Sequence, residues 1–153
     1  MAQQGRRRGF GRKSKDAKLA LLGAVPLFSA CTKRDLSRIA TLVEEVEAPQ
    51  GKVMMRQGDP GRECYVISEG TAKATMRGRG SASLGPGDFF GEMALLDQGP
   101  RTATVTAETD MHLLVLNSRE FFSLLDAVPG VSQRIMRGLA ERLREAERPQ
   151  PQH

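Results

Sequence analysis

Residues 89–105 read FFGEMALLDQGPRTATV, in which two aromatic residues and a glycine precede a short run of good helix formers. A glycine at a helix start lets an anion approach the free backbone N–H groups, because no side chain stands in the way. Arg101 follows Glu92 by nine residues, and its forked guanidinium suits a pair of phosphate oxygens. Glu92 can accept hydrogen bonds from hydroxyl groups such as those of a sugar. The same residue types also fit a surface helix that carries an ordinary Glu and Arg.

The sequence around this stretch has the pattern of short β-strands. Between Val46 and Asn117 the helical period is lost, and short apolar runs alternate with Gly, Pro and Asp turn signals such as those of residues 57–61 and 85–88. This near-regular spacing predicts a small antiparallel barrel or jelly roll. The strands that we expect are residues 53–56, 64–68, 71–76, 81–84, 102–107 and 111–116.

Helical periodicity flanks the strand region on both sides. Apolar spacing predicts two short helices before it, one ended by Pro26 and one that begins behind a Thr32 cap. Two further helices are expected after residue 117, separated by a break at residues 128–130. The expected fold class is therefore mostly β with flanking helices: an antiparallel β-roll or jelly roll (a double-stranded β-helix) with N-terminal helices and two C-terminal helices.

The start of the chain differs in composition from the rest. A length of 153 residues fits one domain with appendages. Before residue 19, basic residues outnumber acidic ones by seven to one, and the remainder of the chain is close to neutral. We expect residues 1–17 to be a disordered basic arm, residues 18–147 to form the domain, and residues 148–153 to be a flexible tail.

The cellular location and the presence of a metal site can be judged from the cysteines, the histidines and the hydropathy of the chain. Cys31 and Cys64 fit free thiols in a reducing cytosol, and His112 and His153 form no pair at metal-ligand spacing. The apolar run 19–28 imitates part of an export signal, but it is only ten residues long and contains a proline. A membrane span needs roughly 20 apolar residues. We expect a cytoplasmic location, no membrane contact, no metal and no cofactor.

The stretch with Glu92 and Arg101 resembles a known motif. Residues 90–96, a gap of three residues, and residues 100–105 resemble the phosphate-binding cassette of cyclic-nucleotide-binding domains, the sensor domains of catabolite activators and of protein kinase A regulatory subunits. The resemblance covers about residues 18–147, nearly all of the chain outside the arm and tail. Supporting matches occur, in the family's order, at residues 25–28, 57–61 and 66–70.

The resemblance implies a role for each cassette residue. Arg101 would bind the exocyclic oxygens of the cyclic phosphate, and Glu92 would accept from the ribose 2′-hydroxyl. The backbone near Gly91, Met93 and Ala94 would complete the phosphate cradle. A buried Glu92 would then reject deoxy analogues, because the carboxylate would be left unpaired.

Two residues bear on which base is bound. Thr102 resembles the residue that contacts the guanine amino group in cGMP-dependent kinases and several channels, where cAMP-selective kinase modules commonly have Ala. Catabolite-activator-like proteins have Ser there and still prefer cAMP, so the choice of base stays open, with cAMP favoured over cGMP. Arg142 falls where some bacterial channel modules place an Arg that stacks on the purine. It also fits a solvated helix face.

Three functional classes compete, and the residues favour one of them. An enzyme is not expected, because the sequence has no nucleotide loop ending in Gly-Lys-Ser/Thr, no His beside a candidate nucleophile and no poised acid pair. Sequence-specific DNA binding is not expected either, because the six residues after Glu147 are too few for a helix-turn-helix. Nonspecific nucleic-acid contact through the arm stays open.

The expected function is therefore a stand-alone sensor of a cyclic nucleotide, with an unknown protein as its partner. Ligand in the cradle would draw residues 118–147 inward as a lid. Four residues with helix-pairing spacing make residues 130–147 the candidate surface for a homodimer, although such a stripe is more often core: Met136, Leu139, Leu143 and Ala146. The alternative is a family fold whose pocket binds nothing and which serves as a protein-interaction module.

Overall fold

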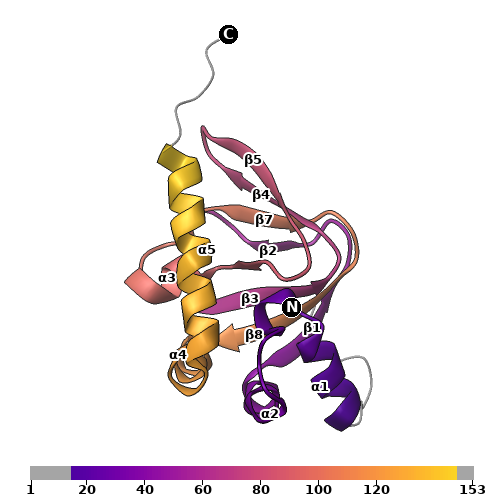
Figure 1. The fold of residues 1–153 in the computed structure, drawn as a ribbon. Helices are drawn as coiled ribbons and strands as arrows, with labels where there is room; N and C mark the ends of the chain where they lie inside the picture. The colour runs from indigo at the N-terminus through magenta and orange to yellow at the C-terminus, as the bar shows by residue number, and fades with distance from the viewer. Residues whose placement is uncertain (1–14, 148–153) are drawn as a thin grey trace.

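Eight short strands form two antiparallel sheets within residues 15–147, the part of the chain that the computed structural model describes (Figure 1). The first sheet has the order β1-β8-β3-β6. Its strands are β1 (Glu44–Ala48), β8 (Met111–Asn117), β3 (Glu63–Glu69) and β6 (Phe89–Phe90). The second has the order β2-β7-β4-β5, with strands β2 (Val53–Met55), β7 (Thr104–Ala107), β4 (Ala72–Met76) and β5 (Gly80–Leu84). The expected β-roll is confirmed.

Strand β8 shows how the roll is filled. Its first six residues are all buried, because alternate side chains enter two different cores. Leu113 and Val115 face the interior of the roll, together with Val105 of the opposite sheet. Leu114 and Leu116 face outward, into a second core that the helices cover. The unbroken apolar run of this strand therefore reflects a sheet that is covered on both faces.

The helices lie against the outer face of the first sheet (Figure 1). Before the strands come α1 (Lys15–Gly23), the 3-10 turn η1 (Pro26–Phe28) and α2 (Lys33–Leu42). After them come α4 (Ser118–Ala127) and α5 (Pro129–Glu147). As expected, Thr32 caps α2. The break predicted over residues 128–130 is limited to Val128, because α5 already begins at Pro129. Pro129 suits the start of α5, since a first-turn residue needs no hydrogen-bonded N–H.

Three details of the prediction were wrong. Strand β1 was not expected, because the glutamates of its sequence EEVEA mask an alternation in which Val46 and Ala48 are buried. Strand β6 was not expected, because two residues are too short to show a period. The strand predicted over 102–107 begins only at Thr104, since the backbone of Arg101 is held by another loop.

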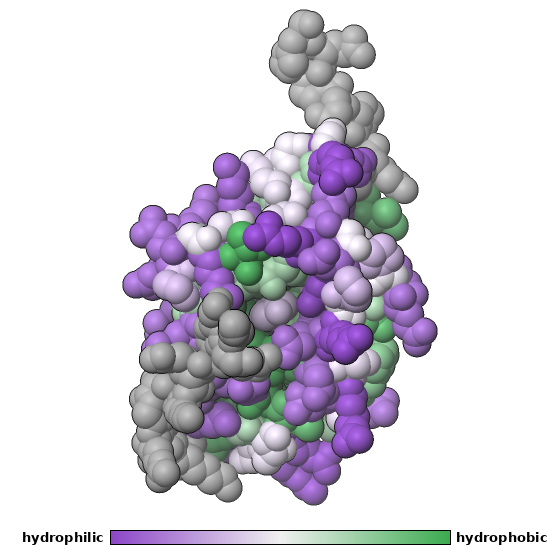
Figure 2. All heavy atoms as spheres, turned by 180° about the vertical axis from the view of Figure 1, so that it is seen from behind, coloured by the Kyte–Doolittle hydropathy of each residue, from purple (hydrophilic) through white to green (hydrophobic). Residues whose placement is uncertain are grey.

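The surface of the molecule seen from behind is largely hydrophilic, with hydrophobic side chains visible near its centre (Figure 2). No helix in the range 15–147 is long and apolar enough to cross a membrane. Helix α1 begins at Lys15, three residues before the boundary that we expected. Residues 1–14 and 148–153, to which the rest of the arm and the tail were assigned, lie outside the described residues.

Candidate functional site

A left-handed glycine turns the chain from β6 into α3 (Glu92–Asp97), the short helix of the cassette. Gly91 has φ of 89° and ψ of −4°. A Cβ atom at this position would lie 2.8 Å from Nη1 of Arg101 and 2.9 Å from the carbonyl oxygen of Glu63. Gly91 is therefore required both by its backbone conformation and by the close approach of its neighbours.

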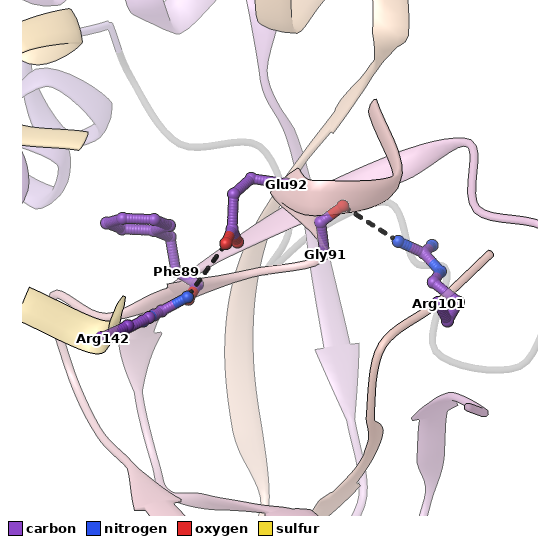
Figure 3. A network of polar contacts seen from close by, with 5 residues as sticks. All are labelled: Phe89, Gly91, Glu92, Arg101 and Arg142. Atoms are coloured by element: carbon purple, nitrogen blue, oxygen red, sulfur yellow. Dashed lines mark hydrogen bonds and ion pairs between the residues drawn. The ribbon is translucent and has the colours of Figure 1, made fainter. Parts of the chain in front are cut away.

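Arg101 is buried beneath this turn, with 7% of its surface exposed. Its Nη1 donates to the carbonyl oxygen of Gly91 at 3.2 Å (Figure 3). The same Nη1 donates to the carbonyl oxygen of Glu63 at 2.8 Å. The guanidinium carbon lies 5.9 Å from the centre of the Tyr65 ring. Nε and Nη2 have no hydrogen-bond acceptor among residues 15–147. A buried cation with unused N–H groups is suited to an anion.

The loop between β2 and β3 fixes the backbone of Arg101. The Gly58 N–H donates to the Arg101 carbonyl at 2.9 Å, and the Arg101 N–H donates to the Asp59 carbonyl at 2.8 Å. A Cβ at Gly61 would lie 2.8 Å from Nε of Arg101 and 2.6 Å from Cβ of Ala94. Sequence reasoning gave this loop no part in the site. Its closely spaced glycines were the available signal, because a glycine permits such contact.

Glu92 is the second buried charge of the site, with 2% of its surface exposed. Its Oε2 lies 3.0 Å from Nη1 of Arg142 (Figure 3). Its Oε1 is buried and accepts no hydrogen bond from the described part of the chain. A buried acceptor without a donor is uncommon and costs free energy. The carboxylate therefore has one oxygen held by α5 and one with capacity for a donor such as a hydroxyl.

Arg142 reaches the cassette from α5. Besides Glu92, it donates through Nη2 to the carbonyl of Phe89, and its guanidinium carbon lies 4.6 Å from the centre of the Phe89 ring. The side chain is 40% exposed. The alternative of a purely solvated helix-face Arg is therefore wrong, and stacking on a purine stays a prediction. Sequence reasoning missed Phe89, which is the partner of Arg142 on the sheet.

The remaining predicted site residues, Met93, Ala94 and Thr102, differ in their exposure to solvent. Ala94 is 3% exposed and faces the Gly61 loop, whereas Met93 is 40% exposed. Thr102 is exposed next to Arg101. A contribution of Met93 therefore rests on its backbone. The structure brings Gly91, Glu92, Arg101 and Arg142 together in one cradle (Figure 3).

The thiol of Cys64 lies next to the cradle, but it is not suited to covalent chemistry. Cys64 is 3% exposed, and its Cα would lie 3.3 Å from a Cβ at Gly91. Burial raises the pKa of this thiol far above its ordinary value, so it stays protonated at neutral pH. No group of three or more potential metal ligands is found within residues 15–147. The chemistry that the cradle offers is recognition: N–H donors for an anion and a carboxylate for a hydroxyl.

We expect the protonation of Glu92 to be visible in the pH dependence of folding. Burial raises the pKa of its carboxyl, and the charge of Arg142 only partly opposes this. Between the ordinary glutamate pKa and the raised one, the folded chain holds a proton that the unfolded chain lacks. Stability should therefore fall as the pH rises through this window. Thermal unfolding of wild type and Glu92→Gln at a series of pH values should show this slope in the wild type alone. Parallel curves would contradict the assignment.

The chain is similar in sequence to proteins of one known family. A family model described as "Cyclic nucleotide-binding domain" matches residues 45–127. The "Cyclic AMP receptor protein" of Thermus thermophilus is 35% identical over 127 residues, which cover 80% of this chain and 59% of that protein. A "cAMP-dependent protein kinase regulatory subunit" of Emericella nidulans is 36% identical over 117 residues, covering 75% of this chain and 28% of that one.

Solved structures of related proteins are similar to this chain in fold. The crystal structure of the Thermus thermophilus catabolite activator protein has a TM-score of 0.70 and 35% identity, covering 80% of this chain and 60% of that chain. A "cAMP-binding acyltransferase" from Mycobacterium smegmatis has a TM-score of 0.72 and 30% identity, with coverages of 85% and 42%. This chain thus spans less than two thirds of the length of each of these relatives.

Proposed function

This chain belongs to the cyclic nucleotide-binding domain family, and we propose that it binds a cyclic nucleotide, with cAMP preferred, in the cradle of Gly91, Glu92 and Arg101. The observation that carries the proposal is the pairing of two buried charges with unused capacity. Arg101 has two nitrogen positions without an acceptor in the described chain, and Glu92 has a buried oxygen without a donor there. A cyclic ribose phosphate supplies the anion and the hydroxyl that these groups lack.

Each residue then has a separate task. Arg101 binds the exocyclic phosphate oxygens with its free N–H groups, while Nη1 keeps its bonds to the backbone of Glu63 and Gly91. Oε1 of Glu92 accepts from the ribose 2′-hydroxyl, while Oε2 keeps its contact with Arg142. Because both side chains are buried and held before the ligand arrives, little conformational entropy is lost on binding.

The preference for cAMP is supported by the relatives, whereas the position of Thr102 keeps cGMP as the alternative. Three of the relatives described above carry cyclic AMP or cAMP in their names. Thr102 is exposed beside Arg101, where its hydroxyl is available either to the phosphate or to the guanine amino group of cGMP. A cGMP-preferring domain is therefore the second candidate, and Thr102 is the residue that favours it.

We propose that the bound nucleotide acts on a partner through α5. Arg142 joins this helix to the ribose-binding carboxylate, so a change at Glu92 reaches α5 directly. On the outer side of the helix, Met136 and Leu143 are 58% and 59% exposed, whereas Leu139 packs against the helical core. The reading of the whole stripe as core is therefore wrong for Met136 and Leu143. These two are the candidate contacts for a partner protein or a second copy.

Removal of Arg142 should weaken this coupling. We expect Arg142→Ala to lower cAMP affinity about 10-fold, which corresponds to roughly 1.4 kcal/mol, because Glu92 loses the contact that holds it in place. Hydrogen exchange of α5 should then respond less to saturating cAMP than in wild type. Arg144→Ala, an exposed neighbour on the same helix, is the matched control and should behave as wild type. An unaltered exchange response in Arg142→Ala would separate α5 from the ligand site.

The proposed function itself is tested by calorimetric titration with cAMP, cGMP, 2′-deoxy-cAMP and 5′-AMP side by side. We expect saturable binding of cAMP, weaker binding of the 2′-deoxy analogue because Glu92 is left unpaired, and none of 5′-AMP. Tighter binding of cGMP would assign Thr102 to the guanine amino group. Binding of none of the four would show a family fold whose pocket does not bind, kept for protein contacts.

The proposal includes no catalytic step. The cradle of residues 91–101 carries donors and an acceptor, and the neighbouring Cys64 thiol is held protonated by burial. Binding of the ligand, rather than its conversion, is the event that the site supports.

A further inference from the structure

Strand β5 is the outermost strand of the second sheet, where it pairs only with β4 (Figure 1). Apart from this pairing, the backbone of residues 80–84 makes no hydrogen bond to any other segment of residues 15–147. Residues 80–83 are exposed, and Leu84 is half-buried. A strand that pairs on one side only has outward N–H and C=O groups, and at β5 these are open to a further strand.

The three other sheet edges of the described chain differ from β5. Strand β1 carries three glutamates among its five residues. Strand β6 has two residues, and β2 has three and a shifted register with β7. Charge, shortness and bulges are the devices by which an edge strand avoids joining another chain.

Strand β5 has none of these devices. It has five residues, reads GSASL, contains neither a charge nor a proline, and pairs with β4 in an unbroken register. Among the sheet edges within residues 15–147, it is therefore the one at which a further strand can add without opposition.

The hairpin that contains β5 is held in place by its own contacts. The Arg79 N–H donates to the Met76 carbonyl at 2.9 Å within the turn. The Arg77 N–H donates to Oε1 of Gln57, also at 2.9 Å, in the loop between β2 and β3. The backbone N–H of Gln57 in turn donates to Oγ1 of Thr104 at 2.9 Å. An edge that is ordered beforehand loses little conformational entropy when it pairs.

A second copy of the same strand fits this edge. In an antiparallel pair with its two-fold axis at Ala82, Ser81 of each copy lies opposite Ser83 of the other. No like charges face each other in this register, and opposed hydroxyl side chains can form hydrogen bonds. The strand is therefore complementary to itself.

The charges beside the strand are complementary in the same register. The turn before β5 carries Arg77 and Arg79, and the turn after it carries Asp88; all three are exposed. An antiparallel pair places residues 77–79 of one copy opposite residues 85–87 of the other, next to Asp88. Charges of opposite sign therefore meet at both ends of the pair.

A foreign segment has less to recognise at this edge. When a strand adds to a sheet, main-chain hydrogen bonds give affinity, and pockets for alternate side chains give specificity. The exposed side chains of β5 are those of serine and alanine, which are too short to form the walls of a pocket. Self-complementarity is thus the specificity that this edge offers.

We propose that two copies of this chain associate through their β5 strands, so that the second sheets of the two copies join across a two-fold axis. One five-residue pair buries little surface, so the dimer should be weak and should form only at high protein concentration. This contact is separate from Met136 and Leu143 on α5, and it does not depend on nucleotide binding.

Sedimentation velocity over a series of protein concentrations tests the pairing. We expect wild type to pass from monomer to dimer as the concentration rises. Ser81→Glu/Ser83→Glu should weaken this association about 10-fold, because carboxylates would face each other at two points. Within one chain, position 83 lies opposite Lys73 of β4, so the hairpin should keep its fold. Ser123→Glu, at an exposed position on α4, is the control and should behave as wild type.

A charge exchange tests the register itself. Ser81→Lys/Ser83→Lys should also weaken self-association, whereas an equimolar mixture of the lysine and glutamate variants should associate at least as strongly as wild type, because opposite charges then face each other. Thermal unfolding verifies that each variant is folded. A wild type that stays monomeric at every concentration would overturn the proposal, as would a mixture that fails to associate. A dimer that the glutamate variant does not weaken would place the contact elsewhere, with α5 as the next surface to test.

Discussion

Arg101→Ala should lower the affinity for cAMP by about 30- to 150-fold, or roughly 2 to 3 kcal/mol. The mutation removes the N–H groups that remain for the cyclic phosphate in a site from which water is largely excluded. It also leaves the carbonyl oxygens of Glu63 and Gly91 without their donor, which should cost about 1–3 kcal/mol of folding stability. Titration calorimetry and thermal unfolding of the same samples separate the two effects.

Arg101→Lys is the matched control for this loss. A lysine keeps the positive charge but supplies one ammonium in place of a planar fork, so it cannot serve the two backbone carbonyls and a phosphate together. Its affinity should fall between those of wild type and Arg101→Ala. If Arg101→Ala folds and binds cAMP as tightly as wild type, Arg101 is not the phosphate anchor.

Gly91→Ala should destabilise the fold by about 3 kcal/mol, the sum of a left-handed backbone conformation and unavoidable contacts. The new Cβ would lie within 3.0 Å of both Arg101 Nη1 and the Glu63 carbonyl. The Glu63 carbonyl is backbone within a paired strand, so it cannot move aside easily. Because the displaced side chain is the proposed anchor, the variant should also lose cAMP affinity. Urea unfolding and calorimetry measure the two losses.

A second glycine separates conformation from contact. Gly51 has a similar φ of 90°, and a Cβ there would meet nothing within 4 Å. Gly51→Ala should therefore cost only the conformational part, about 1 kcal/mol, and leave binding unchanged. Equal losses of stability in the two variants would show that the close approach of Gly91 to Arg101 has no energetic weight.

The fold was largely predictable because its signals are local. Turn residues such as those of 57–61 and 85–88 fix where strands end, and the capping residue Thr32 fixes where α2 begins. The errors fell where local signals are weak. Strand β1 is stabilised by its pairing with β8 and by the burial of only two side chains, and the propensity of its glutamates opposes that state.

The sequence predicted which residues belong to the candidate site, but it did not predict which of them contact each other. Glu92 and Arg101 are close in the sequence, and their chemistry alone pointed to an anion and a hydroxyl. No sequence spacing connects Glu92 to Arg142, which are 50 residues apart, or Arg101 to Glu63, which are 38 apart. These pairs meet only because α5 packs back across the roll and β3 lies beside β6.

The sequence by itself determined the flanking helices, six of the eight strands, and the cassette with its two charged residues, because turn chemistry, periodicity and motif spacing act over a few residues. The tertiary structure decided that Arg142 holds the carboxylate of Glu92 and that the loop around Gly58 and Gly61 holds Arg101. It also decided that one oxygen of Glu92 is buried without a donor from residues 15–147. Those outcomes depend on packing between distant segments, and packing is set by how both cores are filled at once.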